Sequence, residues 1–184
     1  MLTVQGLLLA AGAGRRMGTP KALLHDDDGT PWLHLGWRAL ADGGCDSVTV
    51  VLGAAAEEAR RLVPPGVAVV EAMDWDAGMS ASLRAGLGSL PDDVDAAVVT
   101  LVDLPDVGAA VVARVLATAS GSTALARASY DGTPGHPVVI GRDHWPAVLD
   151  VARGDRGARD YLATADVALV ECGDLATGRD VDSR

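Results

Sequence analysis

Residues 7–21 read Leu-Leu-Leu-Ala-Ala-Gly-Ala-Gly-Arg-Arg-Met-Gly-Thr-Pro-Lys, an apolar run followed by a loop of small residues that ends in cations. The apolar run is long enough for a buried strand. Glycines without a Cβ allow backbone N–H groups to approach phosphate oxygens closely. Arg15, Arg16 and Lys21 supply the positive charge that a polyphosphate requires. This stretch therefore predicts a strand followed by an anion-binding loop.

Lys21 stands out within this loop, because it is the only lysine among the 15 basic residues of the chain. A lysine ammonium is a compact charge on a flexible stem, whereas the arginine guanidinium is a planar fork, so the two are not interchangeable. A chain that otherwise uses arginine indicates a specific need for an ammonium here. The alternative interpretation is a solvated loop cation.

Beyond the loop, short apolar runs alternate with segments of helical periodicity. Strands are predicted at residues 4–10, 47–52, 67–70, 96–102, 123–129, 137–140 and 167–172. Helices are predicted at residues 32–41, 54–63, 79–90, 107–119, 145–151 and 158–163, and a glycine-rich turn at residues 131–136. This alternation is typical of an α/β fold with a doubly wound, mostly parallel sheet and helices on both faces. In such a fold, ligands bind beyond the carboxyl ends of the strands.

Composition narrows the class of protein. A chain of 184 residues that is 49% hydrophobic can form a single domain, residues 1–184, with a sizeable core. The formal charge of −10 argues against nucleic acid as a partner. The sequence shows neither a membrane-spanning run nor a signal peptide, so we expect a cytoplasmic protein. Cys45 and Cys172 are far apart and have no metal-ligand spacing, which predicts two buried thiols.

The loop resembles the signature of the sugar-nucleotide and molybdenum-cofactor nucleotidyltransferases, Leu-Ala-Ala-Gly-x-Gly-x-Arg-Met-Gly-x-x-Lys. Every fixed position is filled, by Leu9, Ala10, Ala11, Gly12, Gly14, Arg16, Met17, Gly18 and Lys21. The loop lacks the Gly-Lys-Ser/Thr end of a Walker loop, and its third glycine falls one residue late for a Rossmann fingerprint. The resemblance implies a Rossmann-like nucleotidyltransferase fold. The residues expected to bind a nucleoside triphosphate are Leu9, Ala10, Ala11, Gly12, Gly14, Arg15, Arg16 and Lys21.

Asp103 follows the predicted strand at residues 96–102 and places a carboxylate at the crevice, where a magnesium ion that bridges phosphates needs one. The family carries a metal-binding Asp in an Asp-x-Pro setting, which this position matches. The alternative is a helix cap.

The segment at residues 178–182 resembles the closing segment of the family, where a late Asp is the second metal ligand. Alignment favours Asp182 over Asp180, and a surface acidic tail is the alternative.

Residues 75–83 resemble the Gly-Met-x-x-Ser-Leu element of the family. Ser80 and Ser82 are therefore expected to contact the nucleobase or a phosphate, through hydroxyls and helix N-terminal N–H groups. An ordinary N-cap is the alternative.

Two further elements resemble the branch of the family that acts on the molybdenum cofactor: the sequence Gly-His-Pro at residues 135–137, and residues 154–159. They imply that His136, Arg156 and Arg159 bind the acceptor. The alternative for the two arginines is pairing with Asp155 and Asp160 on a solvated face.

Together these features predict a magnesium-dependent nucleotidyltransferase, most like molybdenum cofactor cytidylyltransferase, with Arg16, Lys21 and Asp103 as catalytic residues. It would transfer CMP from CTP to the phosphate of molybdopterin, and a molybdoenzyme or its maturation chaperone would be its protein partner. One alternative is a GTP-using enzyme that acts on molybdopterin or on another small phosphorylated acceptor. Others are a non-catalytic cofactor-binding or maturation chaperone, and a nicotinamide-linked oxidoreductase.

Overall fold

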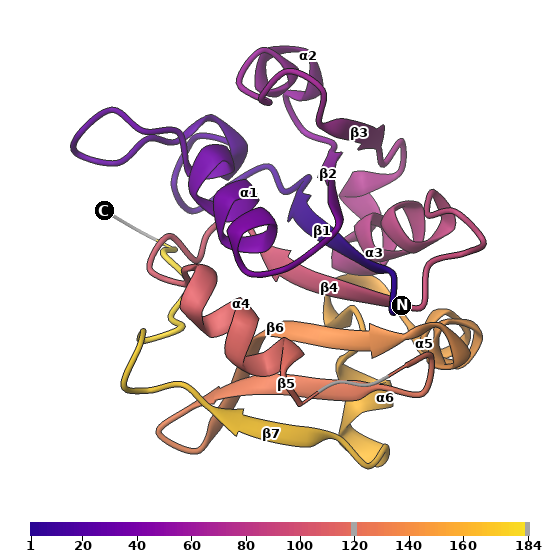
Figure 1. Ribbon diagram of the computed structural model, residues 1–184. Helices are drawn as coiled ribbons and strands as arrows, with labels where there is room; N and C mark the ends of the chain where they lie inside the picture. The colour runs from indigo at the N-terminus through magenta and orange to yellow at the C-terminus, as the bar shows by residue number, and fades with distance from the viewer. Residues whose placement is uncertain (119–120, 183–184) are drawn as a thin grey trace.

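A computed structural model describes residues 1–118 and 121–182 of the chain (Figure 1). Within these residues, seven strands form one sheet in the order β3-β2-β1-β4-β6-β5-β7. The strands are β1 (Val4–Ala10), β2 (Ser47–Leu52), β3 (Ala68–Glu71), β4 (Ala96–Leu101), β5 (Leu125–Tyr130), β6 (Thr133–Gly141) and β7 (Ala168–Glu171). Strands β1 to β4 pair in parallel, β6 is antiparallel to both β4 and β5, and β7 is parallel to β5. The sheet is therefore mostly parallel, with β6 running against the rest.

Both faces of the sheet are covered, which explains why the central strands read as continuous apolar runs. In β1, Leu8 packs with the cluster that includes helices α1 (Trp32–Asp42), α2 (Ala56–Arg60) and α4 (Ala109–Leu116). Leu7 packs on the opposite face, with the cluster that includes α3 (Met79–Gly88), α5 (Trp145–Val151) and α6 (Arg159–Thr164). Figure 1 shows α1 and α4 in front of the sheet and α3 behind it. The predicted doubly wound α/β architecture is confirmed.

Three predicted helices extend at least two residues further than the observed ones; α3 ends at Gly88 instead of residue 90. Helix α2 covers five residues of the predicted 54–63, because Ala55 has a positive φ of 55° that a continuing helix does not allow. Helix α4 begins at Ala109, after Gly108 in an extended conformation, and Ala119 at the end of the predicted range lies outside the described residues. Each remaining predicted helix and strand overlaps an observed one.

The predicted turn at residues 131–136 is wrong in extent. The β5–β6 connection consists of Asp131 and Gly132 alone, with φ values of 50° and 81°. Two adjacent residues with positive φ form the primed turn whose twist matches a tight hairpin, and Asp-Gly is a favoured pair for it. Residues 133–136 therefore belong to β6 and not to the turn, so His136 lies on a strand.

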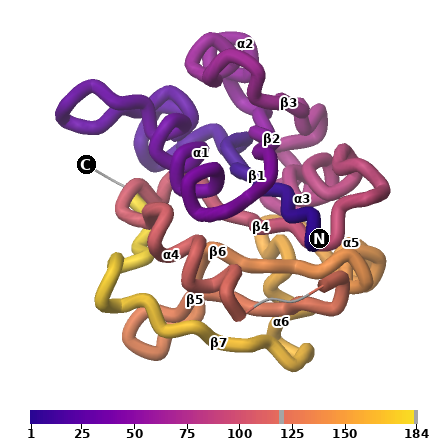
Figure 2. Tube along the Cα trace, viewed as in Figure 1, coloured from indigo at the N-terminus to yellow at the C-terminus, as the bar shows by residue number. Residues whose placement is uncertain are grey.

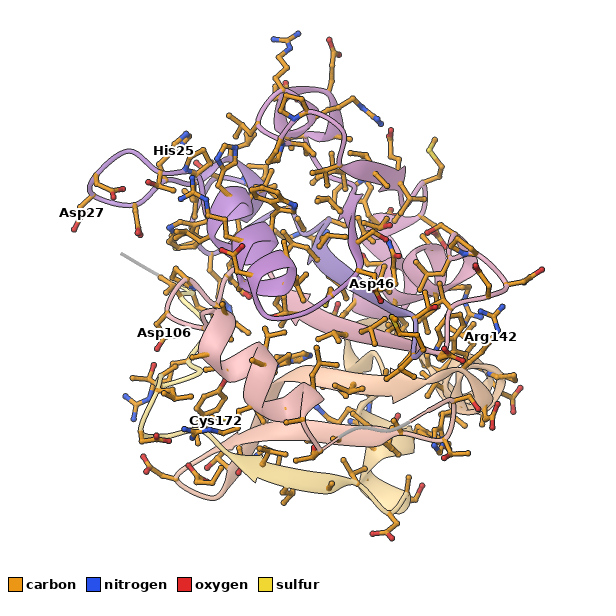
Figure 3. All side chains as sticks on the ribbon, in the orientation of Figure 1. His25, Asp27, Asp46, Asp106, Arg142 and Cys172 are labelled. Carbon is orange, nitrogen blue, oxygen red and sulfur yellow. The ribbon has the colours of Figure 1, made fainter. Side chains whose placement is uncertain are left out.

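The C-terminal segment returns from β7 to the carboxyl end of β4 (Figure 2, yellow). The Thr177 N–H and hydroxyl both donate to Asp106 Oδ2, at 2.7 and 2.6 Å, and the Val181 N–H donates to the Asp103 carbonyl at 3.0 Å. Figure 3 shows Asp106 at the end of the sheet opposite Arg142. These bonds hold the late aspartates beside Asp103, just beyond the carboxyl end of β4.

Cys45 and Cys172 are free and buried, which confirms the predicted thiols. Among residues 1–118 and 121–182, no helix has both the length and the apolar content that crossing a membrane requires.

Candidate active site

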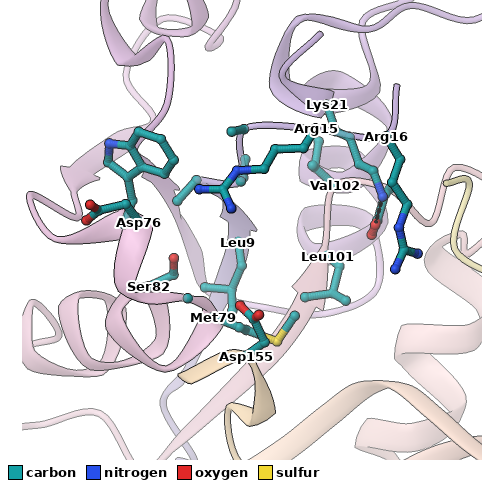
Figure 4. Close-up of a pocket in the computed structure, with 18 of the residues that line it drawn as sticks. Leu9, Arg15, Arg16, Lys21, Asp76, Met79, Ser82, Leu101, Val102 and Asp155 are labelled. Carbon is teal, nitrogen blue, oxygen red and sulfur yellow. Dashed lines mark hydrogen bonds and ion pairs between the residues drawn. The ribbon is translucent and has the colours of Figure 1, made fainter. Parts of the chain in front are cut away.

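The glycine loop lines a cavity of about 360 Å³ between the carboxyl ends of β1 and β4 and the start of α3 (Figure 4). Figure 4 shows Arg15, Arg16 and Lys21 on the loop side, with Met79, Ser82 and Asp155 across the cavity. The loop is held in place from both sides, because the Ala54 N–H donates to the Ala11 carbonyl and the Val102 N–H donates to the Leu9 carbonyl. The structure brings these predicted nucleotide-binding residues to the cavity wall: Leu9, Ala10, Ala11, Gly12, Gly14, Arg15, Arg16, Lys21, Ser82 and Asp103.

Ser80 is the exception. It is buried and lines a different, open hollow with Asp74, Arg84 and Arg153. Residues two apart on an α-helix lie on different faces, so Ser80 and Ser82 of α3 cannot both face one cavity. Of the two serines, the structure places Ser82 on the wall of the cavity lined by the glycine loop and Ser80 in the other hollow.

The loop glycines differ in why they are glycines. Gly14 has φ of 60°, and a Cβ at this residue would lie 2.0 Å from the Thr19 carbonyl oxygen. Its backbone conformation and the close approach of the chain therefore both exclude a side chain. A Cβ at Gly12 would meet no atom within 4 Å. At Gly12 the absence of a side chain therefore leaves space in the cavity, whereas at Gly14 it permits the backbone turn.

Lys21 is the first residue of the short 3₁₀ helix η1 (Lys21–Leu23), and its ammonium group is held by two carboxylates. Its Nζ donates to Asp103 Oδ2 at 2.6 Å and to Asp182 Oδ1 at 2.7 Å. Burial by itself would lower the pKa of Lys21, but these hydrogen bonds and the two negative charges raise the pKa above its ordinary value. Arg16 Nη1 lies 3.4 Å from Asp182 Oδ2 with 81% of its side chain exposed, a contact that contributes little by itself.

Three carboxylates converge beside Lys21: single oxygens of Asp103, Asp180 and Asp182 lie within 4.8 Å of one another. Asp103 Oδ1 is buried and has no hydrogen-bond partner among the described residues. Hydrogen bonds from Lys21 and Asp180 lower the pKa of Asp182, and the neighbouring Asp182 raises the pKa of Asp180. An unpartnered buried oxygen among carboxylates suits a hard divalent cation, which prefers oxygen ligands.

Sequence reasoning chose Asp182 over Asp180, whereas the structure brings both to Asp103. The Asp-x-Asp spacing could have predicted that both carboxylates lie near Asp103, because residues two apart in an extended chain face the same side.

A second cavity, of about 660 Å³, adjoins the first. The predicted acceptor residues His136, Arg156 and Arg159 all line it. Residues that line both cavities include Leu9, Arg16, Met79, Leu101, Asp103, Asp155 and Asp182. The carboxylates and Arg16 therefore lie where the two cavities meet.

The three predicted acceptor residues differ in their surroundings. Burial, and then the charges of Arg127 and Arg159, lower the pKa of His136 to about 4, so its imidazole is neutral near pH 7. Arg156 Nε donates to both oxygens of Asp160, at 2.7 and 2.9 Å, as the alternative interpretation of this residue expected. Arg159 makes no hydrogen bond or ion pair within the described part of the chain.

Sequence reasoning missed Arg127 and Asp155. Arg127 lies on β5, lines the second cavity and donates from Nε to the Gly135 carbonyl at 3.1 Å. Its signal was a cation inside an otherwise small and apolar strand, Leu-Ala-Arg-Ala-Ser-Tyr. Asp155 lines both cavities because Gly78 lets its loop approach: a Cβ on Gly78 would lie 2.6 Å from Asp155 Oδ1.

Comparison with known proteins gives this geometry a family context. A family model described as the MobA-like NTP transferase domain matches residues 6–170. The chain is also 38% identical to a protein named nicotine blue oxidoreductase from Paenarthrobacter nicotinovorans, over 98% of this chain and 92% of that relative.

Solved structures share the fold. A nucleotidyl transferase from Methanothermobacter thermautotroptrophicus superposes with a TM-score of 0.81 at 23% identity, covering 98% of this chain and 92% of the other. Rv0371C of Mycobacterium tuberculosis H37Rv, solved as a complex with manganese, superposes with a TM-score of 0.77 at 26% identity, covering 97% and 94%. The predicted Rossmann-like nucleotidyltransferase fold is confirmed by these likenesses.

Proposed function

Because this chain belongs to the family of MobA-like NTP transferase domains and is a nucleotidyltransferase, we propose that it transfers CMP from CTP to the phosphate of molybdopterin and releases pyrophosphate. The observation that carries the proposal is the convergence of Lys21, Asp103 and Asp182 on the cavity lined by the glycine loop. The chain acts in this proposal as a single nucleotidyltransferase domain, residues 1–184.

The first cavity holds the triphosphate in this proposal. Backbone N–H groups of the glycine loop approach the phosphate oxygens, and Arg15, Arg16 and Lys21 neutralise their charge. Ser82 lies across the cavity, where its hydroxyl is available to the nucleotide. Lys21 is already oriented, because its two carboxylate partners hold the ammonium at the cavity wall.

The family generally uses a divalent metal ion. We assign Mg²⁺ to Asp103 and Asp182, with Asp180 as a further ligand, since the unpartnered Asp103 Oδ1 fits such an ion. When bound, Mg²⁺ supplies positive charge that offsets the charge developing on the transferred group.

The second cavity holds the acceptor. A phosphate oxygen of the acceptor forms a bond to the α-phosphorus of CTP, the bond from that phosphorus to its bridging oxygen breaks, and pyrophosphate leaves with the electron pair. A phosphate nucleophile is already ionised near neutral pH, so no general base is required. The product would pass to a molybdoenzyme or its maturation chaperone.

The choice of CTP is supported by Ala10, Ala11 and the Gly-His-Pro sequence at residues 135–137, which resemble the cytidylyl branch of the family. A GTP-using enzyme, on molybdopterin or on another small phosphorylated acceptor, is the runner-up.

Pyrophosphate release tests the proposal. Purified protein, magnesium and molybdenum cofactor are incubated with CTP, GTP, ATP or UTP in turn. The Arg60→Gln variant serves as a matched control, because it removes an ion pair with Glu71 and neither residue lines the two cavities. Release with CTP alone is expected. Release with GTP alone keeps the chemistry and overturns the base assignment. Nucleotide binding without release from any of the four contradicts the transfer reaction and favours a non-catalytic binding or maturation protein.

A second candidate function is the reduction of an organic substrate by a reduced nicotinamide. One observation favours it: the 38% identity to a protein whose name is nicotine blue oxidoreductase. Oxidation of NADH or NADPH with nicotine blue, followed by absorbance in the absence of magnesium, tests it. Turnover there, without pyrophosphate release in the first assay, would replace the transferase proposal.

A further inference from the structure

We propose that Tyr130, the last residue of β5, is a positioning residue for the divalent cation, because its ring holds the C-terminal segment, residues 172–182, against the β5–β6 hairpin. This segment carries Asp180 and Asp182, two of the three carboxylates that converge beside Lys21. The inference rests on the proposed function, in which these carboxylates hold the metal ion. Tyr130 itself lines neither cavity, so its effect on the metal ion passes through the segment.

The Tyr130 ring is buried, and the backbone of two glycines packs against it. A Cβ on Gly178 would overlap Cδ2 and Cε2 of the ring and would lie 2.5 Å from Cζ. A Cβ on Gly135 would lie 2.8 Å from Cε2 and 3.0 Å from Cδ2. Gly135 belongs to β6 and Gly178 to the C-terminal segment, so the same side of one ring contacts both. Neither position has room for a side chain while the ring occupies this place.

The hydroxyl of Tyr130 fixes where the ring lies. It donates to the His136 carbonyl at 2.6 Å, one residue beyond Gly135 on β6. Burial raises the pKa of this hydroxyl, so it keeps its proton and remains a donor near pH 7. Moving the ring to another rotamer would break the bond and leave a buried donor without a partner, which is unfavourable. The hairpin therefore sets the position of the ring, and the ring in turn supports Gly178.

The contact with the ring falls at a sensitive place in the C-terminal segment. Hydrogen bonds from Thr177 and Val181 tie the segment to the residues that follow β4. Gly178 lies between these two points, just before the part of the segment that carries the two aspartates. Val181 also packs on the hydrophobic cluster that contains Tyr130. The ring is thus the support on the hairpin side, and removing it loosens both aspartates relative to Asp103.

Calorimetry with Mn²⁺ on the nucleotide-free protein tests the inference. Partners that orient metal ligands typically contribute roughly 10- to 100-fold in metal affinity. Tyr130→Leu removes the ring and should weaken Mn²⁺ binding by about tenfold or more. Tyr130→Phe keeps the ring and should bind Mn²⁺ within about threefold of the wild type. Tyr161→Leu is the matched control: it removes the other tyrosine of the chain, which contacts His144 and lines neither cavity, and should leave the affinity unchanged.

A double-mutant cycle with Gly178→Ala isolates the contact between the ring and the segment. The added methyl group meets the ring when Tyr130 is present, whereas the strain of an alanine at a φ of 63° is the same with tyrosine or leucine at residue 130. Gly178→Ala should therefore weaken Mn²⁺ binding at least about fivefold more with tyrosine at residue 130 than with leucine. Equal effects in the two backgrounds would show that the ring does not act through the segment.

Amide hydrogen exchange follows the segment without any metal ion. The Val181 N–H, which is bonded to the Asp103 carbonyl, reports local opening of the segment. It should exchange about tenfold faster in Tyr130→Leu than in the wild type, Tyr130→Phe or Tyr161→Leu. Equal Val181 exchange in Tyr130→Leu and Tyr161→Leu would overturn the inference, because loss of a tyrosine anywhere would then have the same effect.

Two results with Mn²⁺ would also overturn the inference: unchanged affinity in Tyr130→Leu, or no binding by the wild type. Pyrophosphate release with CTP and molybdenum cofactor is measured separately. Release by an enzyme whose Mn²⁺ affinity is independent of Tyr130 rejects this inference alone. Mn²⁺ affinity that depends on Tyr130, without release from any of the four nucleotides, rejects the transferase proposal alone.

Discussion

The two adjoining cavities are assembled in different ways. The first is built mainly from one continuous stretch, residues 9–16, together with Lys21 and the ends of parallel strands. The second collects residues from the β5–β6 hairpin, the segment before α6 and the C-terminal segment. Their charges differ as well, because Lys21 in the first is paired with two carboxylates, whereas the half-buried Arg127 in the second makes no ion pair among the described residues. In the proposed function, the paired ammonium of the first cavity faces the triphosphate and its metal ion, and the guanidinium of Arg127 lies in the cavity that takes the acceptor.

Removing the ammonium of the first cavity should have the largest effect. The Lys21→Ala variant is expected to lose about 2 to 4 kcal/mol of transition-state stabilisation, the size typical of one lost charge-stabilising group. The measurement is the rate of pyrophosphate release under saturating CTP. Unchanged release would contradict the role assigned to Lys21.

The same variant should bind Mn²⁺ more tightly in the absence of nucleotide. Without the ammonium, Asp103 and Asp182 keep their charges uncompensated, which raises their attraction for a cation. Calorimetry with Mn²⁺ alone measures this, and equal affinity in both proteins would show that the cation site lies elsewhere.

The two loop glycines sharpen the account of the first cavity. Gly14→Ala forces a Cβ against the Thr19 carbonyl at positive φ, so we expect it to lower the free energy of unfolding by about 1 to 3 kcal/mol. Gly12→Ala has open space and should leave stability unchanged while weakening CTP binding. Urea denaturation and calorimetry with CTP separate the two effects. Similar stability losses in both variants would contradict the assignment.

The hairpin that supports the second cavity should weaken in acid. The Glu171 carboxylate accepts N–H groups of Gly132, Gly173 and Asp131, which lower its pKa to about 2. Because the folded pKa is depressed, this contribution to stability is present above the ordinary value of 4.5 and is lost as pH falls from there toward 2. Glu171→Gln should flatten the dependence of the urea midpoint on pH in that window, and an unchanged slope would contradict it.

His136 gives a smaller, local test of the charges in the second cavity. Its pKa of about 4 lies below the ordinary 6.5, so its contribution destabilises the fold progressively as pH falls from 6.5 toward 4. Arg159→Gln removes one of the neighbouring charges and should raise the His136 pKa toward its ordinary value. NMR titration of the imidazole measures the shift, and an unchanged pKa would contradict the electrostatic effect of Arg159 on His136.

The sequence allowed the first cavity to be predicted more completely than the second. The glycine loop follows its strand directly, so its residues are neighbours in the chain as well as in space. Asp103 could also be predicted to lie at this cavity, because it follows a strand and the carboxyl ends of parallel strands lie at one edge of the sheet. Ser80 lines a different hollow from Ser82 because residues two apart on a helix lie on different faces, which the matching motif does not specify.

The second cavity depends on pairings that no local pattern specifies. Arg127 reaches the cavity through the antiparallel register of β5 with β6, and the short Asp131-Gly132 turn sets where His136 lies on β6. Asp180 joins Asp103 because hydrogen bonds from Thr177 to Asp106 and from Val181 to Asp103 hold the C-terminal segment just beyond the carboxyl end of β4. These are long-range contacts, so residue types alone indicated candidates without placing them together.

The most direct test of the account is a crystal structure with Mn²⁺ and a non-hydrolysable CTP analogue, read by the anomalous scattering of manganese. We expect a manganese peak bonded to Asp103 Oδ1 and to Asp182, at the junction of the two cavities, with the triphosphate on the glycine loop and within reach of Lys21. A triphosphate bound away from the glycine loop, or manganese bound away from Asp103, would contradict it.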